Sequence, residues 1–371
     1  MIVRITQLTD PAHSPPGARL AWLAAGADGR PLGTAFLRLP ADGKVADLEL
    51  RVHPAERRAG VGTRLLDAVA AAATDLDLSG LLTEPVQENS EADAFYQARS
   101  LRRVLALTYT RLPLNEAGTI APAAAIAPAA AIGPAAAIAP AAAIGPAATT
   151  APPAAIAPPA TTASPAATAP PAAAPNPATA TPTGAASTPS PTAPTTTVSG
   201  PAVDGYRLVH WEGTVPDELA ETFARSRRAM DDMPMDDAGY TPQPWDVARL
   251  HAIAEAVAKR NEILCTTAAV APNGEIAGFT ELVVPADGQG DGQHYGTGVL
   301  PEHRSRGLAR WMKTEAIALA RVRFPTLAGL LADTADSNTA MRRINDELGY
   351  RPVYRSYLYQ LDLSPPVSPP A

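Results

Sequence analysis

Two short segments of the chain have the residue types that bind a pyrophosphate. Each has the form Arg-x-x-Gly-x-small, as Arg57-Arg58-Ala59-Gly60-Val61-Gly62 in the first half and Arg304-Ser305-Arg306-Gly307-Leu308-Ala309 in the second. N–H groups at the start of a helix have no partner within the helix, and the helix dipole adds positive charge there. The small residues let the backbone approach an anion, and the arginines add charged donors. The pattern therefore predicts two pyrophosphate cradles.

Both segments connect a predicted strand to a predicted helix, which is the placement that this chemistry requires. The alternating run 48–52 ends at Val52, before His53 and Pro54, and the run 295–299 ends at Val299, shortly before Pro301. Apolar-periodic stretches typical of helices follow both loops. A single such loop is as readily explained as a surface turn, but two copies in the same context favour binding. Neither loop is the Gly-x-Gly-x-x-Gly fingerprint of a dinucleotide fold.

These two units resemble the GNAT superfamily of acetyl-CoA-dependent N-acyltransferases, whose signature is Arg/Gln-x-x-Gly-x-Gly/Ala after the fourth strand. The stretch from Asn338 to Tyr350 is similar to the family's next helix and turn, and a closing strand, 356–363, follows. The stretch from Asn89 to Arg99 resembles the same helix with a degenerate end. The resemblance implies that acetyl-CoA is the cofactor, that Val52, Val299 and the two loops hold it, and that Asn338 contacts its pantetheine arm.

For proton transfer the resemblance implies a tyrosine that protonates the departing thiolate. Tyr96 matches that position in the first half, whereas the second half has Asn345, so Tyr350 or Tyr354 is the expected substitute there. For the general base, strand alternation in 276–284 places Glu281 so that it could point into a cleft, and a salt-bridged edge residue is the alternative. His294 is the other candidate base, because its ordinary pKa suits the task.

Composition divides the chain into two folded halves and a linker. The chain has 371 residues and 40 prolines, and the stretch 117–203 has no charged residue. Proline recurs every sixth residue there, which forbids a long helix and argues against a membrane span. The sequence therefore predicts two α/β, mixed-sheet GNAT-like domains, 1–114 and 204–364, joined by a disordered Ala/Pro-rich linker, 115–203, with a Pro-rich tail, 365–371.

The two halves are not equivalent. The first has only a short loop, 9–17, where the family places two helices over the acceptor, so it is expected to lack a lid. The second has amphipathic helices predicted over 216–225 and 245–259. Between them, the segment 230–237 gathers methionines and carboxylates. It is either a solvated loop or part of a pocket for a cationic amine.

Other features exclude some classes of function. A net charge of −7 without a basic stripe argues against nucleic acid as a partner, and the six histidines show no metal-ligand spacing. The single cysteine, Cys265, in a strand-like run, is expected to be a core thiol in a cytoplasmic protein. We expect a small-molecule amine as the partner, no membrane or nucleic-acid partner, and a monomer or homodimer.

Three hypotheses about function follow. The first is an N-acetyltransferase, with catalysis in the second half and a structural or regulatory first half. The second is a non-catalytic tandem protein that binds acyl-CoA. The third divides the catalytic groups between the halves, with Tyr96 donating a proton near a pocket that the second half covers.

Overall fold

The computed structural model of the chain describes residues 3–8, 17–40, 44–114, 196–198, 205–238 and 244–363. Residues 9–16 of the expected short loop, the tail 365–371 and all of the expected linker except 196–198 lie outside these ranges. Those three residues form β8 (Thr196–Val198), which pairs with β9. A strand therefore lies inside the range that the sequence analysis gave to the linker.

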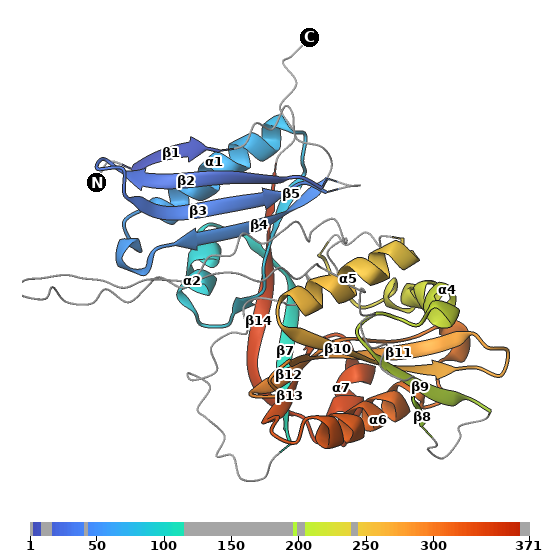
Figure 1. Ribbon diagram of the computed structural model, residues 1–371. Helices are drawn as coiled ribbons and strands as arrows, with labels where there is room; N and C mark the ends of the chain where they lie inside the picture. Colours follow the sequence, from blue (N-terminus) through green and yellow to red (C-terminus); the bar gives the residue numbers. More distant parts are fainter. Residues whose placement is uncertain are drawn as a thin grey trace, which may run out of the picture. The chain divides into compact units, whose positions relative to one another are not determined.

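The first half is a twisted sheet with one long helix against it (Figure 1). Its strands and helices, in chain order, are β1 (Val3–Gln7), β2 (Arg19–Gly26), β3 (Pro31–Arg38), β4 (Val45–Val52), α1 (Val61–Asp75), β5 (Gly80–Thr83), β6 (Val86–Gln87), α2 (Glu91–Ala98) and β7 (Arg102–Pro113). β1 to β4 form an antiparallel meander, and β5 is parallel to β4 after the α1 crossover. The apolar face of α1 packs on this sheet through residues such as Leu65 and Val69.

The second half repeats this order and adds two helices near its start. After β8 it contains β9 (Arg207–Glu212), α4 (Asp217–Ser226), α5 (Val247–Lys259), β10 (Glu262–Val270), β11 (Ile276–Pro285), β12 (Asp291–Val299), α6 (Leu308–Arg323), β13 (Gly329–Ala335), α7 (Thr339–Glu347) and β14 (Arg351–Asp362). α4 and α5 match the two helices predicted from periodicity. The carboxylate of Asp246 caps α5 by accepting from the Arg249 amide at 2.7 Å.

The last strand of each half is exchanged. Fourteen strands join one sheet in the part of the chain that the structure describes, and its order near the middle is β5-β14-β7-β13. β14, expected to close the second half, instead pairs with β5 of the first half and with β7. β7 in turn pairs, through residues 107–113, with the whole of β13 of the second half. The two GNAT-like units therefore share a continuous ladder of backbone hydrogen bonds.

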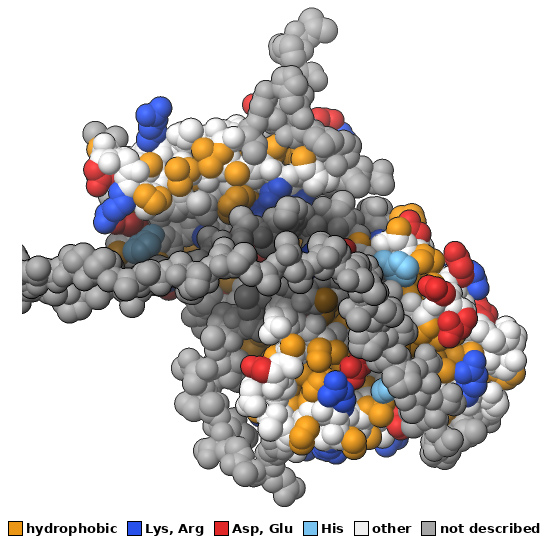
Figure 2. All heavy atoms as spheres, in the orientation of Figure 1, with side chains coloured by type: hydrophobic (Ala, Val, Ile, Leu, Met, Phe, Trp, Pro, Cys, Tyr) orange, Lys and Arg blue, Asp and Glu red, His pale blue; other side chains and the backbone are white. Residues whose placement is uncertain are grey.

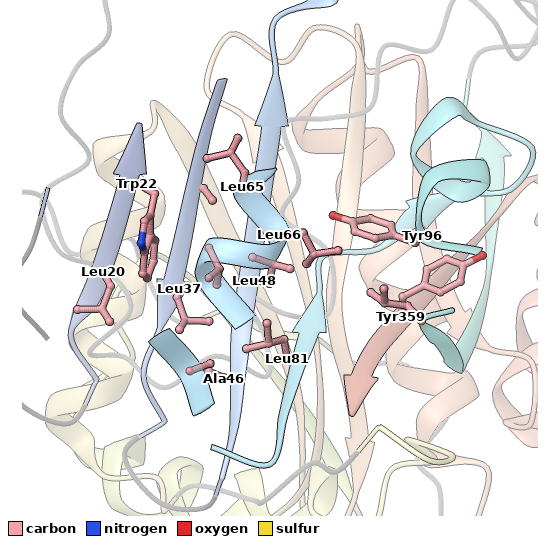
Figure 3. Packing of buried hydrophobic residues seen from close by; sticks show 14 of the residues in the cluster. Leu20, Trp22, Leu37, Ala46, Leu48, Leu65, Leu66, Leu81, Tyr96 and Tyr359 are labelled. Carbon is pink, nitrogen blue, oxygen red and sulfur yellow. The ribbon is translucent and has the colours of Figure 1, made fainter. Parts of the chain in front are cut away.

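Side chains from each exchanged strand belong to the core of the other half. Tyr357 and Tyr359 of β14 are buried in the first-half core. Tyr359 lies beside Tyr96 (Figure 3). The Tyr359 hydroxyl donates to Asp93 at the start of α2 and accepts from Arg103 Nε at 2.8 Å. Leu112 of β7 is buried in the core of the second half. Neither core is complete without the other half's strand.

This exchange gives a prediction about fragments. Residues 1–114 and 196–371, produced separately, are each expected to lack a stable fold, because each loses a central strand and its buried side chains. Produced together, they are expected to copurify as one complex. A matched control is the full chain cut at a protease site inserted near residue 150, which should stay associated. A cooperative thermal transition of either fragment alone would contradict the prediction.

The surface carries charges of both signs (Figure 2), and the helices are those of a protein without a helical membrane span in its described ranges. On the face shown in Figure 2, basic and acidic side chains are interspersed with hydrophobic ones. No helix within the described ranges is both long enough and apolar enough to cross a lipid bilayer.

Candidate active site

Two neighbouring parallel strands of the second half split apart. β12 and β13 pair only over the three positions Asp291–Gly329, Gly292–Leu330 and Gln293–Leu331, although both strands continue beyond them. Past Gln293 the β13 side of β12 has no ladder partner among the described residues. Backbone N–H and C=O groups without such a partner need another ligand. The split therefore offers backbone hydrogen bonds to an extended molecule that enters it.

A bulge in β12 lies next to the split. Glu281 of β11 opposes Gly296 and Leu282 opposes His294, so Tyr295 is an extra residue without a partner on β11. A bulge of this kind bends its strand and increases the local twist, which helps to turn β12 away from β13. The corresponding strand of the first half, β4, pairs with β3 in unbroken register over 47–52. The two repeats thus differ at the element that opens the cleft.

Both predicted cradles have the backbone conformation that such a loop requires. Gly60 and Gly307 are the residues before α1 and α6, with φ of 78° and 75°, in the left-handed region that glycine adopts without strain. Two residues earlier, Arg58 and Ser305 also have positive φ, 64° and 62°. A Cβ built on either glycine meets no heavy atom within 4 Å. The space above each helix start is therefore open.

A cavity of about 860 Å³ connects the split with the second cradle. Its wall is formed by the ends of β12 and β13, the start of α6, one face of α7 and the segment before α5. The exchanged strand β7 contributes Leu105 and Leu107. The cavity thus runs from the helix start, where an anion would bind, to the bottom of the split, where the strands still pair.

Most predicted cofactor residues of the second half line this cavity. They are Val299, Arg304, Ser305, Gly307, Leu308, Ala309 and Asn338, whereas Arg306 is exposed and is not part of the wall. Asn338 also caps α7, because its side-chain oxygen accepts from the Met341 amide at 3.1 Å. In the first half the same residue types recur at Arg57–Gly62, and Arg57 pairs with Glu91 at 2.5 Å.

Arg304 was predicted to bind the pyrophosphate, and in the structure it is bonded to other residues of the protein. Its guanidinium donates two hydrogen bonds to Asp232, at 2.6 and 2.7 Å, and a third to the Val299 carbonyl at 2.9 Å. The hydrogen bonds from Arg304 lower the pKa of the Asp232 carboxyl. The methionine-rich segment 230–237 is thereby held against the end of β12, and Met230 packs on Gly298. Because Met230, Met233 and Met235 line the cavity, the pocket interpretation of this segment is favoured over a solvated loop.

Glu281, the first candidate for the general base, does not line the cavity. Its carboxylate forms two hydrogen bonds with Arg227, and both side chains are almost fully buried. The Arg227 guanidinium also lies over the rings of Phe223, Trp245 and Phe279. A buried carboxylate with a bidentate arginine partner is a structural ion pair, so this geometry gives Glu281 no route to an acceptor amine.

His294 and Tyr350, the other two candidates in the second half, are bonded to each other. Their Nε2 and Oη atoms are 2.7 Å apart, and both residues are buried. Burial and the nearby Lys313 charge hold the pKa of His294 well below its usual value, so the ring is neutral at pH 7. Burial raises the pKa of Tyr350. His294 lines the cavity but Tyr350 does not, and neither is placed to change protonation readily near neutral pH.

Tyr96, the candidate in the first half, lies in a different core from this cavity. It packs against Phe95 and Tyr359, with ring centroids 5.3 and 5.6 Å away (Figure 3). Burial raises the pKa of its phenol. The cavity of the second half receives Leu105 and Leu107 from the first half, but not Tyr96.

Two ionisable cavity residues were missed by the sequence analysis. Lys313 of α6 is 2% exposed, and burial lowers the pKa of its ammonium to about 7. Asp333 of β13 accepts from Gln293 Nε2 at 2.9 Å, and burial raises the pKa of its carboxyl to about 6. An alignment of the two repeats on their first loop arginines would have drawn attention to Lys313. Lys313 is nine residues after Arg304, and the residue nine positions after Arg57 is Leu66.

Comparisons with known proteins agree with this architecture. The chain is similar to a solved tandem GNAT protein from the clavulanic acid biosynthesis pathway, determined without AcCoA, with 19% identity, a TM-score of 0.59 and 95% of this chain and 85% of that chain covered. It is also similar to a GCN5-related N-acetyltransferase from Sphaerobacter thermophilus, with 15% identity, a TM-score of 0.51 and coverages of 93% and 81%. No curated protein sequence matches the chain significantly.

At these identities the solved structures establish the tandem fold. The sequence profile of the acetyltransferase (GNAT) family matches residues 5–100 and 228–350, which together make up more than half of the chain. The chain therefore belongs to the acetyltransferase (GNAT) family.

Proposed function

We propose that the second half of the chain transfers an acetyl group from acetyl-CoA to the amine of a small molecule. The observation that carries this proposal is the cavity that joins the Gly307 cradle to the split between β12 and β13. The α6 amides would hold the pyrophosphate, and the unpaired edge of β12 would bind the amides of the pantetheine arm. The thioester would then lie deep in the split, next to the bulged strand.

The opposite wall has the character of a site for an amine with an apolar body. Met230, Met233 and Met235 are adaptable apolar side chains, and Leu105 and Leu107 extend this surface. Asp333 is the carboxylate at the bottom of the split. An amine held there could attack the thioester carbonyl directly, because the cavity brings both molecules into one space. A strand N–H of the split would stabilise the negative charge that develops on the carbonyl oxygen.

The test is calorimetric titration of acetyl-CoA into the full chain, followed by measurement of CoA release with a panel of primary amines that differ in apolar size. We expect saturable binding and faster release with alkyl and aryl amines than with strongly polar ones. Absence of binding would overturn the proposal. Binding without transfer to any amine would instead support the non-catalytic role in acyl-CoA binding.

A further inference from the structure

Two positions in the cavity differ in a coordinated way from their counterparts in the first half. Lys313 occupies the position of Leu66, counted from the first arginine of each loop, and Asn345 occupies the position of Tyr96, counted from Asn338 and Asn89. In the first half, Leu66 and Tyr96 belong to one core, in which Figure 3 shows their side chains turned toward each other. In the second half, both counterparts line the cavity. An apolar and aromatic pair has been replaced by two polar side chains.

Lys313 lies at the bottom of the split. The two strands stop pairing after Gln293 and Leu331. His294 follows one residue after that point on β12 and Asp333 two residues after it on β13, and both interact electrostatically with Lys313 in the same cavity wall. From the turn before β14, the Tyr350 ring lies 5.2 Å from Nζ. No hydrogen bond or ion pair joins Nζ to another described residue. A buried ammonium without such partners is costly, so its presence where the first repeat has a leucine calls for a role.

The other polar groups around Lys313 are either paired with another residue or uncharged. Arg310, one turn earlier on α6, pairs with Glu347 of α7 at 3.3 Å. His294 is bonded to Tyr350 and stays neutral. Asn345 donates to Thr334 at 3.2 Å, while its buried side-chain oxygen has no partner. Asp333 is therefore the ionisable group whose charge complements Lys313 across the split.

We propose that Lys313 is the general acid of this cavity, which protonates the departing CoA thiolate, and that Asp333 is the base that takes the proton lost by the amine. This inference rests on the proposed acetyl transfer and assigns its proton-transfer groups. The amine nitrogen bonds to the thioester carbon, and the C–S bond breaks. One proton passes from nitrogen to the Asp333 carboxylate, and the Lys313 ammonium gives one to sulfur. Return of the proton from Asp333 to Lys313 restores both groups.

The acid–base behaviour that burial gives the two residues supports this assignment. Burial brings the pKa of Lys313 down to about 7 and the pKa of Asp333 up to about 6, so both can exchange protons near neutral pH. The working state needs Asp333 ionised, which is favoured above its pKa, and Lys313 protonated, which is favoured below its pKa. The rate is therefore expected to rise with pH near 6 and to fall above about 7. Because the two groups interact, the pKa values read from the rising and falling sides of the profile belong to the pair and not to one residue each.

The first measurement uses CoA itself, so it needs no acceptor. The ultraviolet absorbance of the thiolate is followed against pH for CoA bound to the full chain. We expect the thiol of bound CoA to ionise at lower pH than that of free CoA, because an ammonium lies beside it, and we expect this shift to disappear in Lys313→Leu. Leucine is the residue of the first repeat, and it removes a buried charge, so the variant should fold. Equal thiol ionisation in the two proteins would overturn the proposal.

The second measurement is the pH dependence of acetyl transfer. Lys313→Leu is expected to lose roughly 100-fold or more in kcat, the range of a general acid, with little change in acetyl-CoA affinity. The double variant Lys313→Leu/Asn345→Tyr rebuilds the pair of the first repeat and should recover part of the rate without the fall above pH 7. Asp333→Asn should remove the rise near pH 6. If the wild type transfers acetyl groups and Lys313→Leu does so equally well, the proposal fails and acetyl transfer stands. If the chain binds no CoA, both fail.

Discussion

Replacing Gly307 by glutamate is expected to weaken acetyl-CoA binding in the second half by roughly 100-fold to 1,000-fold. The new carboxylate would stand beside the α6 amides that are expected to receive the pyrophosphate. Two like charges ~4 Å apart at an effective dielectric constant of ~20 repel by about 4 kcal/mol, and exposure to solvent reduces that value. Calorimetric titration of acetyl-CoA into the variant measures the change directly.

Two matched variants separate charge from backbone strain. Gly307→Ala introduces a side chain at the same positive φ without a charge, so it should lose some stability but little affinity. Gly60→Glu makes the identical change in the first repeat, where the loop has nearly the same φ. If catalysis belongs to the second half, Gly60→Glu leaves transfer intact. Loss of transfer in Gly60→Glu but not in Gly307→Glu would assign the working site to the first half.

Replacing Arg227 by methionine is expected to have the largest effect on stability. The change leaves the buried Glu281 carboxylate without its partner, which typically costs about 3–5 kcal/mol. For a protein of this size, such a loss lowers the Tm by roughly 10 °C. The Phe223, Trp245 and Phe279 rings around the guanidinium would also lose their cation. Thermal unfolding followed by circular dichroism measures the effect.

The double variant Arg227→Met/Glu281→Leu provides the control. Removing both charges replaces the ion pair with apolar side chains of similar volume, so it should recover most of the stability that the single change loses. It also tests the role of Glu281. If the pair is structural, the double variant keeps substantial acetyl transfer at low temperature. A folded double variant without activity, but with normal acetyl-CoA binding, would restore Glu281 as a catalytic candidate.

The sequence predicted the local units well, because their signals are local. The helices after the two loops and the helices α4 and α5 all depend on residues only a few positions apart. Family membership followed from the same loops. The positions of β7 and β14 depend instead on which of two similar sheets each strand joins, and no local pattern distinguishes the alternatives.

The catalytic groups were harder to predict for a related reason. Strand alternation in 276–284 made Glu281 a candidate, but the presence of Arg227 opposite its carboxylate depends on the packing of the segment after α4 against the sheet. Lys313 was not singled out, because its burial depends on how α6 packs against the strands of the sheet, which no local pattern shows. Comparison of the two repeats with each other contains this information, because Leu66 marks the position as a core site.

The exchange of β7 and β14 has a consequence for how the protein is made. β5 emerges from the ribosome roughly 280 residues before its neighbour β14. At a synthesis rate of ~5–20 residues per second, the first repeat waits roughly 15–60 s for the strand that completes its core. During that interval the edge of β5 is open and the position of Tyr359 is empty. The nascent first half is therefore a candidate client for chaperones until β14 has been synthesised.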